Sequence, residues 1–345
     1  MSEGKKRRRL ADLSHRAYEH PADRAALAAL RKMKGVDLAL RKLFGLVGER
    51  SLSYLYLGSA VRVSQKQFRS VHRVYRDCLE TLDFPGEPDL YVAQTPFVNA
   101  GAIGLDKPFI VLNSGTLDLF GQDELRCILG HELGHILSDH VLYKTMLRIL
   151  LSLATFGASI PLGGLAVFAL VSSLREWDRK SELSGDRAGL LCAQDPALAF
   201  QVLMQMAGGS QVEEMNIAEF VAQAEEYEKG GDALDGVFKL LNLMGASHPL
   251  HVIRLSELRT WVDSGGYDRI LGGDYPTRDT DENTSVYEDF NSSAASYRQA
   301  FRDSQDPLAS LLRDVGQTFA DKGSELLEQL RVSFSRPPDK PDEKK

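Results

Sequence analysis

Apolar side chains recur at three- and four-residue spacing along two stretches of this chain. Between residues 64 and 84 the apolar face consists of Phe68, Val71, Tyr75, Cys78 and Leu82. Between residues 122 and 148 the same spacing runs through Leu125, Ile128, Leu129, Leu133 and Ile136. This spacing is typical of amphipathic helices that bury one face. Both stretches are therefore predicted to be helical.

Three short apolar segments lie between these two helices, at residues 90–93, 97–103 and 109–112. Residues 85–88, with the sequence Pro-Gly-Glu-Pro, separate them from the first helix, and residues 105–108 form a turn between the last two. Segments of this length, bounded by such residues, favour strands. Helical patterns fill residues 21–50, 182–192, 196–206 and 213–228. The fold class is therefore predicted to be α+β and predominantly helical, with a small β-sheet next to the helix at 122–148.

Residues 149–174 contain no charged side chain. As one helix this segment would be about 39 Å long, enough to cross a bilayer. Glycines and one proline, at positions 157, 161, 163 and 164, interrupt it near its middle, so each half is too short to span. We predict an apolar helical hairpin at 146–175. It either contacts a membrane surface or packs against protein. Basic residues that would suit anionic headgroups flank it: Lys144, Arg148, Arg175, Arg179 and Lys180.

The pattern divides the chain into one large domain and several appendages. Residues 1–20 are predicted to be a basic disordered tail, and residues 21–264 the main domain with the hairpin inserted. Residues 265–305, rich in Gly, Asp, Ser and Thr, are predicted to be a linker. Residues 306–335 are predicted to be an amphipathic helix and residues 336–345 a charged tail.

Composition narrows the class of protein. The net charge of -7 over 345 residues argues against general nucleic-acid binding. Three cysteines, odd in number and unpatterned, indicate a reducing compartment without a disulfide framework. The basic residues 5–9 are followed by mixed polar sequence rather than an apolar signal segment. We therefore expect a chain that is not secreted and lies on the cytoplasmic side. The basic run is either a solvated tail or a contact with anionic lipid.

Residues 131–135 read His-Glu-Leu-Gly-His, an HExxH motif. On a helix His131 and His135 are one turn apart, so their imidazoles point the same way and suit a zinc ion. Glu132 is placed to act as general base toward an attacking water. The alternative without a metal site is a solvated helix with two unrelated histidines. His140, about 180° around a continuing helix from His131, is not expected to share the metal.

A zinc hydrolase usually has three protein ligands, so the third must come from elsewhere. Glu182 and Asp186 lie one helical turn apart. Glu182 would complete a His-His-Glu site, and Asp186 could accept a hydrogen bond from a ligand histidine. The alternative is a pair on a surface helix. If the site forms, a single membrane crossing at 149–174 is excluded, because it would separate His131 from Glu182.

Several motifs occur here in one order: HELGH, then ELSGD at 182–186, then Ser-His-Pro at 247–249 with Arg254. Residues 98–100 and 110–117 precede them. Over residues 60–260 the chain resembles the HtpX-like zinc metallopeptidase family. The resemblance implies a gluzincin-like fold, one zinc ion and endopeptidase activity. It also implies that Asn99 and Ala100, on the edge of the sheet, bind substrate backbone as an added strand.

The resemblance further implies that His248 lies near the active site as an oxyanion donor and that Arg254 braces the site. The sequence alone makes Ser247 and Pro249 a capped helix start. Membrane-bound relatives have full transmembrane pairs where this chain has its shorter hairpin.

The sequence therefore predicts a zinc-dependent endopeptidase that hydrolyses extended or misfolded polypeptides. His131, His135 and Glu182 would hold zinc, with Glu132 as the base. The expected partners are polypeptide substrates and a membrane surface through 146–175, and no nucleic acid. Two alternatives stay open. One is a protease for membrane or prenylated substrates. The other is a non-catalytic, zinc-stabilised adaptor or chaperone-like scaffold, which would have no need of the base Glu132.

Overall fold

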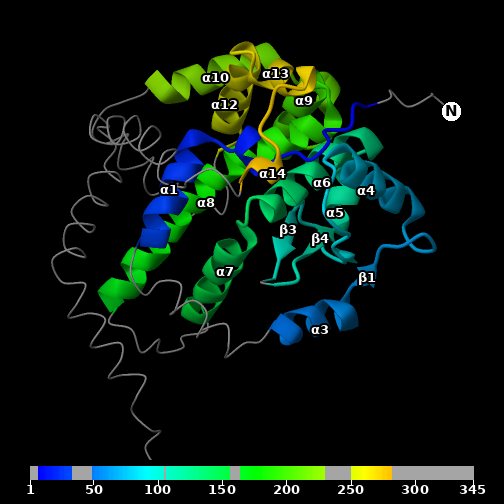
Figure 1. Ribbon diagram of the computed structural model, residues 1–345, viewed down its shortest axis with the longest axis vertical. Helices are drawn as coiled ribbons and strands as arrows, with labels where there is room; N and C mark the ends of the chain where they lie inside the picture. The colour runs from blue at the N-terminus through cyan, green and yellow to red at the C-terminus, as the bar shows by residue number, and fades with distance from the viewer. Residues whose placement is uncertain (1–6, 33–48, 105, 156–163, 230–249, 282–345) are drawn as a thin grey trace, which may run out of the picture.

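The computed structural model describes residues 7–32, 49–104, 106–155, 164–229 and 250–281 (Figure 1). Up to the hairpin the elements are η1 (His15–Ala17), α1 (Pro21–Lys32), α3 (Glu49–Ser59), β1 (Val61–Arg62), α4 (Arg69–Thr81), β2 (Leu90–Ala93), β3 (Ala100–Ile103), β4 (Phe109–Asn113), α5 (Ser114–Leu119) and α6 (Gln122–Leu137). They continue with α7 (Val141–Thr155), α8 (Gly164–Ala193), α9 (Pro196–Gly208), η2 (Val212–Glu214), α10 (Ile217–Lys229), α12 (His251–Asp263), α13 (Gly266–Gly272) and α14 (Arg278–Asp281).

Helices α6 and α8 pack very closely at the centre of the molecule. Glycines make this possible, because a β-carbon on Gly130 would lie 2.5 Å from Cys192 Cβ, and one on Gly134 would lie 2.4 Å from Ala188 Cβ. Both distances are far below van der Waals contact. The two backbones can therefore approach only where one helix has no side chain. This close approach places the side chains of α6 directly against those of α8.

The four-stranded sheet has the order β1-β2-β4-β3, so β3 is an edge strand. β2 and β4 are parallel, whereas β3 pairs with β4 antiparallel from Ala100↔Leu112 to Ile103↔Phe109. Alternate residues face opposite sides, as the period of a strand requires. One face joins the main core, and the other is covered by Tyr56 and Ala60 of the α3 region. The predicted α+β class, mostly helical with a small sheet, is confirmed.

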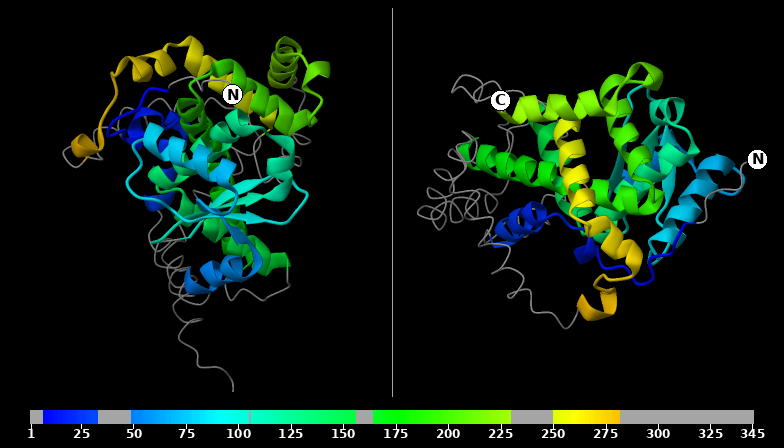
Figure 2. Two further views of the ribbon diagram at one scale, coloured as in Figure 1. Left: turned by 90° about the vertical axis from the view of Figure 1, so that its right-hand side faces the viewer. Right: turned by 90° about the horizontal axis from the view of Figure 1, so that it is seen from above.

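A layer of helices caps the end of α6 and α8 opposite α3. It consists of α9, α10, α12 and α13 (Figures 1 and 2). α12 contacts both α8 and α9, and α9 also contacts α6. Leu255 and Leu258 of α12 are buried in the main core. This packing brings Arg254, on the same helix, toward the region where α6 meets α8.

Helix α4 is shorter than the helix predicted over residues 64–84. Val71, Tyr75 and Cys78 form its buried face, as the spacing predicts. Phe68, by contrast, is 39% exposed and adopts a left-handed backbone with φ 52° at the N-cap. The helix therefore begins only at Arg69, and Phe68 does not belong to the core.

The prediction of a disordered tail at residues 1–20 is wrong from residue 7 onward. Leu10, Leu13 and Tyr18 are fully buried in the main core. The Leu10 N–H donates to Thr81 O, and the Tyr18 hydroxyl donates to Gly134 O on α6. The three residues are spaced by three and then five positions, which continues neither a helical nor a strand repeat, so their burial depends on surfaces supplied by α4 and α6.

The predicted linker at 265–305 is also wrong at its beginning. Residues 266–272 form α13, in which Tyr267 and Ile270 are buried. Thr277 forms an isolated bridge with Leu13, and the Arg278 guanidinium pairs with Asp12. Each segment thus covers polar backbone of the other. The remainder of the linker, the helix at 306–335 and the tail at 336–345 lie outside the described residues, as do residues 1–6.

The helix predicted over 122–148 is divided in two. α6 ends at Leu137, Asp139 has a φ of 56°, and α7 begins at Val141. The predicted hairpin at 146–175 corresponds to most of α7 and the first part of α8, and residues 156–163 between them lie outside the described part. Its base packs on α1, where Ala26 and Leu27 meet Met146, Leu150 and Trp177. Among the described residues, no helix combines the length and apolar character needed to cross a bilayer.

Candidate functional site

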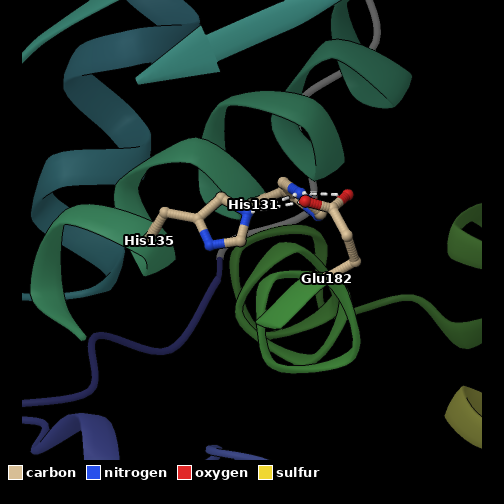
Figure 3. Close-up of side chains that lie close together, drawn as sticks. All are labelled: His131, His135 and Glu182. Carbon is tan, nitrogen blue, oxygen red and sulfur yellow. Dashed lines mark hydrogen bonds and ion pairs between the residues drawn. The ribbon is translucent and has the colours of Figure 1, made fainter. Parts of the chain in front are cut away.

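Two elements supply the candidate metal ligands. His131 and His135 project from α6 toward Glu182 on α8 (Figure 3). The two histidine Nε2 atoms are 3.0 Å apart. Glu182 Oε2 lies 3.4 Å from His131 Nε2, and Glu182 Oε1 lies 3.3 Å from His135 Nε2. The three side chains are largely buried, and one donor atom from each lies within 4.8 Å of the others.

The spacing of these donors fits zinc. Zinc is bound by nitrogen and oxygen at about 2.0–2.1 Å in tetrahedral geometry, which separates neighbouring donors by about 3.3 Å. The distances between the donors here cluster around that value. Two imidazoles and one carboxylate leave a fourth position open, as catalytic zinc sites do. The donor set therefore suits a catalytic metal rather than a closed structural one.

His131 is held by a carboxylate that is itself clamped by arginine. Its Nδ1 lies 3.1 Å from Asp186 Oδ1. Arg254 donates from Nε to Asp186 Oδ2 at 2.8 Å and from Nη2 to Oδ1 at 2.5 Å. Burial raises the pKa of the Asp186 carboxyl, but Arg254 outweighs it, and the net shift is downward. The structure thus brings together Asp186 and Arg254, both singled out from the sequence.

The same surroundings control the proton on His131. Burial lowers the pKa of the imidazole, but Glu182 and Asp186 raise it to about 9 in the metal-free protein. The pKa of His135 is instead lowered well below its ordinary value, by burial and by the nearby Lys144 charge. Near neutral pH His131 is therefore protonated and His135 is neutral, so a metal ion must displace the additional proton of His131.

His135 has an outer partner that the sequence reasoning missed. Its Nδ1 lies 3.0 Å from His140 Nδ1, and His140 Nε2 lies 3.1 Å from Asp23 Oδ2. The expectation that His140 points away assumed a continuing helix. The left-handed residue Asp139 breaks the helix instead and turns His140 back. The Ser-Asp pair at 138–139 was a turn signal, whereas nothing in the sequence pointed to Asp23.

Glu182 also has an outer partner, Lys144. The ammonium donates to Glu182 Oε1 at 2.6 Å and to Asp178 Oδ1 at 2.5 Å. Lys144 is only 5% exposed. Burial lowers its pKa, but the two carboxylates outweigh burial and raise it. Lys144 is thus an internal ion-pair partner and is not available to a lipid headgroup. Arg179 and Lys180 likewise pair with Glu176.

Glu132 lies against the edge strand of the sheet. Its Oε2 accepts the Ala102 N–H at 2.7 Å, and Arg148 donates to Ala102 O at 3.3 Å. Backbone groups alternate in direction along a strand, so those of Ala100 point the same way as those of Ala102. The Asn99 N–H and C=O are held by Thr116 Oγ1 at 2.9 and 2.7 Å. Ala100 is therefore the position on β3 whose polar groups face outward beside Glu132.

Glu132 lines a pocket that, with the open solvent at its mouth, encloses about 590 Å³. Val98, Asn99 and Ala100 form one wall. His131, Glu132, Glu182, Asp186 and Arg254 form the polar part. Apolar residues from α6, α8, α9 and α12 form most of the remainder: Ile128, Leu190, Val202, Leu203, Met206 and Leu258. His248 lies outside the described residues. Every other site residue predicted from the sequence lines this cavity or, like His135, adjoins it.

Known proteins resemble this chain. Residues 65–262 match peptidase family M48. The chain is 34% identical over 267 residues to the plastoglobule-localized metallopeptidase 48, chloroplastic, of Arabidopsis thaliana. The aligned region covers 75% of this chain and 76% of that protein. It is 34% identical over 77 residues to a protease HtpX homolog of Helicobacter pylori, covering 22% of this chain and 25% of that protein. A protease HtpX homolog of Kineococcus radiotolerans is 31% identical over 148 residues, covering 39% and 49%. No solved structure matches the chain significantly.

Proposed function

The chain belongs to peptidase family M48 and is a metalloprotease, and we propose that it is a zinc-dependent endopeptidase of the gluzincin type. His131, His135 and Glu182 hold one zinc ion in this proposal. The observation that carries it is the cluster of donor atoms: the two Nε2 atoms lie 3.0 Å apart, and each lies 3.3–3.4 Å from one of the two Glu182 oxygens, which suits tetrahedral zinc. Its polypeptide substrate follows from the family.

Zinc in such a site supplies a Lewis acid that polarises the scissile carbonyl and makes a water molecule more acidic. Glu132 takes the proton from the attacking water and delivers it to the leaving amine. Its position supports this role, because it adjoins the ligand His131 in the chain and lines the same cavity. The Ala102 N–H holds one of its oxygens, which leaves the other for proton transfer.

The remaining site residues position these groups. Asp186 orients His131, and Arg254 holds Asp186 by two hydrogen bonds. His248 is proposed as an oxyanion donor on the strength of the family resemblance alone. The substrate backbone pairs with β3 at Ala100, beside Asn99, as an added antiparallel or parallel strand. Since main-chain pairing demands little of sequence, the favoured substrates are extended or misfolded polypeptides.

We also propose that the chain meets a lipid surface through α3 and the hairpin at 146–175. Tyr54, Leu55 and Leu57 of α3 are 64%, 59% and 49% exposed. α3 lies at the same end of the molecule as the last turn of α7 (Figures 1 and 2). The Arabidopsis relative is named as plastoglobule-localized. Flotation with anionic vesicles tests this, with Leu55→Asp expected to lower the bound fraction; equal binding would contradict it.

Metal content and cleavage, measured together, test the proposed activity. Glu182→Gln removes the charge of the third ligand while keeping its shape, so zinc binding and cleavage of an unfolded protein should both fall. Glu225→Gln on α10, at an exposed position, is the matched control and should change neither. Zinc bound fully by the Glu182 variant would place the third ligand elsewhere. Zinc bound by the wild type with no cleavage of any polypeptide would favour the adaptor, and cleavage only of prenylated or membrane peptides would favour the narrower protease.

A further inference from the structure

Asp23 lies on α1, far from the metal ligands in sequence, yet it ends a chain of contacts that begins at one of them. His135 Nδ1 lies 3.0 Å from His140 Nδ1, and His140 Nε2 lies 3.1 Å from Asp23 Oδ2. His135 is 2% exposed, and both His140 and Asp23 are fully buried. The contacts are therefore shielded from bulk water.

The position of the metal fixes the proton at each step of this chain. A metal on His135 Nε2 requires the neutral ring to carry its proton on Nδ1. That N–H faces His140 Nδ1, which must then accept. His140 consequently carries its own proton on Nε2, the atom that faces the Asp23 carboxylate. Only a hydrogen-bond acceptor at position 23 is compatible with protons on His135 Nδ1 and His140 Nε2.

Asp23 is held as such an acceptor by two further donors. Trp177 Nε1 donates to Oδ1 at 3.0 Å, and the Ser184 hydroxyl donates to Oδ2 at 2.6 Å. Burial raises the pKa of the carboxyl, but His140, Ser184 and Trp177 outweigh it, and the net shift is downward. A buried carboxylate that accepts two hydrogen bonds and lies 3.1 Å from His140 Nε2 stays ionised and fixed in orientation.

We propose that Asp23 is a positioning residue of the metal centre, acting through His140 to set the proton and ring orientation of His135. The N-terminal segment 7–32, which precedes the residues that match the family, is then part of the metal site and not only of the core. This inference rests on the proposed zinc site. Outer partners of ligand histidines typically contribute 10–100-fold to metal affinity.

Asp23→Asn is a sharp test, because an amide offers one acceptor and one donor where the carboxylate has two acceptors. If the amide NH₂ faces Trp177, two donors oppose each other. If it faces His140, that ring must shift its proton to Nδ1, against His135. The first arrangement opposes two buried donors and is therefore disfavoured, and the second disturbs His135. We expect the zinc dissociation constant, measured by competition with a chromophoric chelator, to rise about 10–100-fold.

The double variant Asp23→Asn/Trp177→Phe removes the donor that opposes the amide. The NH₂ can then face the ring at position 177, which no longer carries an N–H, and the amide oxygen returns to His140. Zinc affinity should recover most of the loss, while Trp177→Phe alone should stay within a few-fold of the wild type. If Asp23 only stabilised the fold, the double variant should bind zinc no better than Asp23→Asn. The second substitution would then only remove packing from a buried site. No recovery would overturn the proton order on which the proposal rests.

Asp83→Asn is the matched control for a loosened N-terminal segment. Asp83 accepts the Asp12 N–H at 2.7 Å and pairs with Arg9 and Arg278, but it does not touch the histidines. Its zinc affinity should match the wild type. Equal zinc affinity in folded Asp23→Asn would overturn the positioning role and leave the proposed function intact. Absence of zinc binding by the wild type would instead overturn the proposed function.

If Asp23→Asn does not fold, the proton order is measured in the zinc-loaded wild type. Nitrogen-15 chemical shifts distinguish the two tautomers of a neutral imidazole. His140 should carry its proton on Nε2 and His135 on Nδ1. A proton on His140 Nδ1 would overturn the proposal without any substitution.

Discussion

Gly185→Ala probes the closest contact between α8 and the metal ligands. A β-carbon at this position would lie 2.6 Å from Cε1 of His131 and 2.8 Å from both of its ring nitrogens. Ordinary contact begins near 3.4 Å, so the ring or the helix must move by about 0.8 Å. Metal sites tolerate about 0.2 Å in their ligand distances. The displacement is therefore about four times what the zinc site can absorb.

Zinc affinity, measured by chelator competition, should fall by about 100-fold in this variant. Overpacking should also lower the free energy of unfolding in chelator by about 1–3 kcal/mol. Gly272→Ala is the control, because a β-carbon there meets nothing within 4 Å. It should leave both quantities unchanged. A Gly185→Ala protein that binds zinc as tightly as the wild type would refute the described packing of His131 on α8.

Three further predictions follow from the site and the core. The pKa of His131 in the metal-free protein is about 9, so zinc must displace a proton from it below that pH. Zinc affinity should therefore rise about tenfold per pH unit from pH 6.5 to 8.5. A flat pH profile in chelator competition would contradict this. Because that folded pKa is raised, the stabilisation that the His131 proton gives the metal-free protein is complete below pH 6.5 and is lost as pH approaches 9. Lys144→Met leaves Glu182 and Asp178 buried without their cation, and should lower the free energy of unfolding in chelator by about 3–5 kcal/mol; urea denaturation measures it, and an unchanged midpoint would refute the ion pair. Leu10→Ala truncates a fully buried side chain and should cost about 2–5 kcal/mol, whereas a disordered tail would show no change in thermal unfolding.

The local parts of the site could be predicted because their geometry follows from helical spacing. His131 and His135 need only one turn of helix to face the same way, and the same is true of Glu182 and Asp186. The approach of the two histidines to Glu182 depends on glycines in α6 and α8. The HExxH motif does not specify these glycines, because Gly134 occupies one of its variable positions. The fold class followed from the same periodicities, which also gave the buried face of α4.

The outer contacts of the site could not be predicted, because they join segments distant in sequence. Asp23 and His140 lie far apart in the sequence, and no spacing relates them. From the sequence, Lys144 is predicted to flank a membrane hairpin, since a cation beside an apolar run is typical of such a flank. Its actual partner Glu182 is visible only once α7 packs on α8. Composition likewise led to the wrong predictions of a tail at residues 7–20 and a linker at residues 265–281. The burial of both segments comes from tertiary contacts alone.

The assignment of Glu132 as the base is tested by comparing the wild type with Glu132→Gln. Both proteins are loaded with zinc, their metal content is measured, and each is incubated with casein as an unfolded substrate. Glu132 is not a ligand in this account, so the variant should bind one zinc ion per chain and cleave nothing, while the wild type cleaves and a zinc chelator stops it. Cleavage by the variant at the rate of the wild type would contradict the assignment of Glu132 as the base.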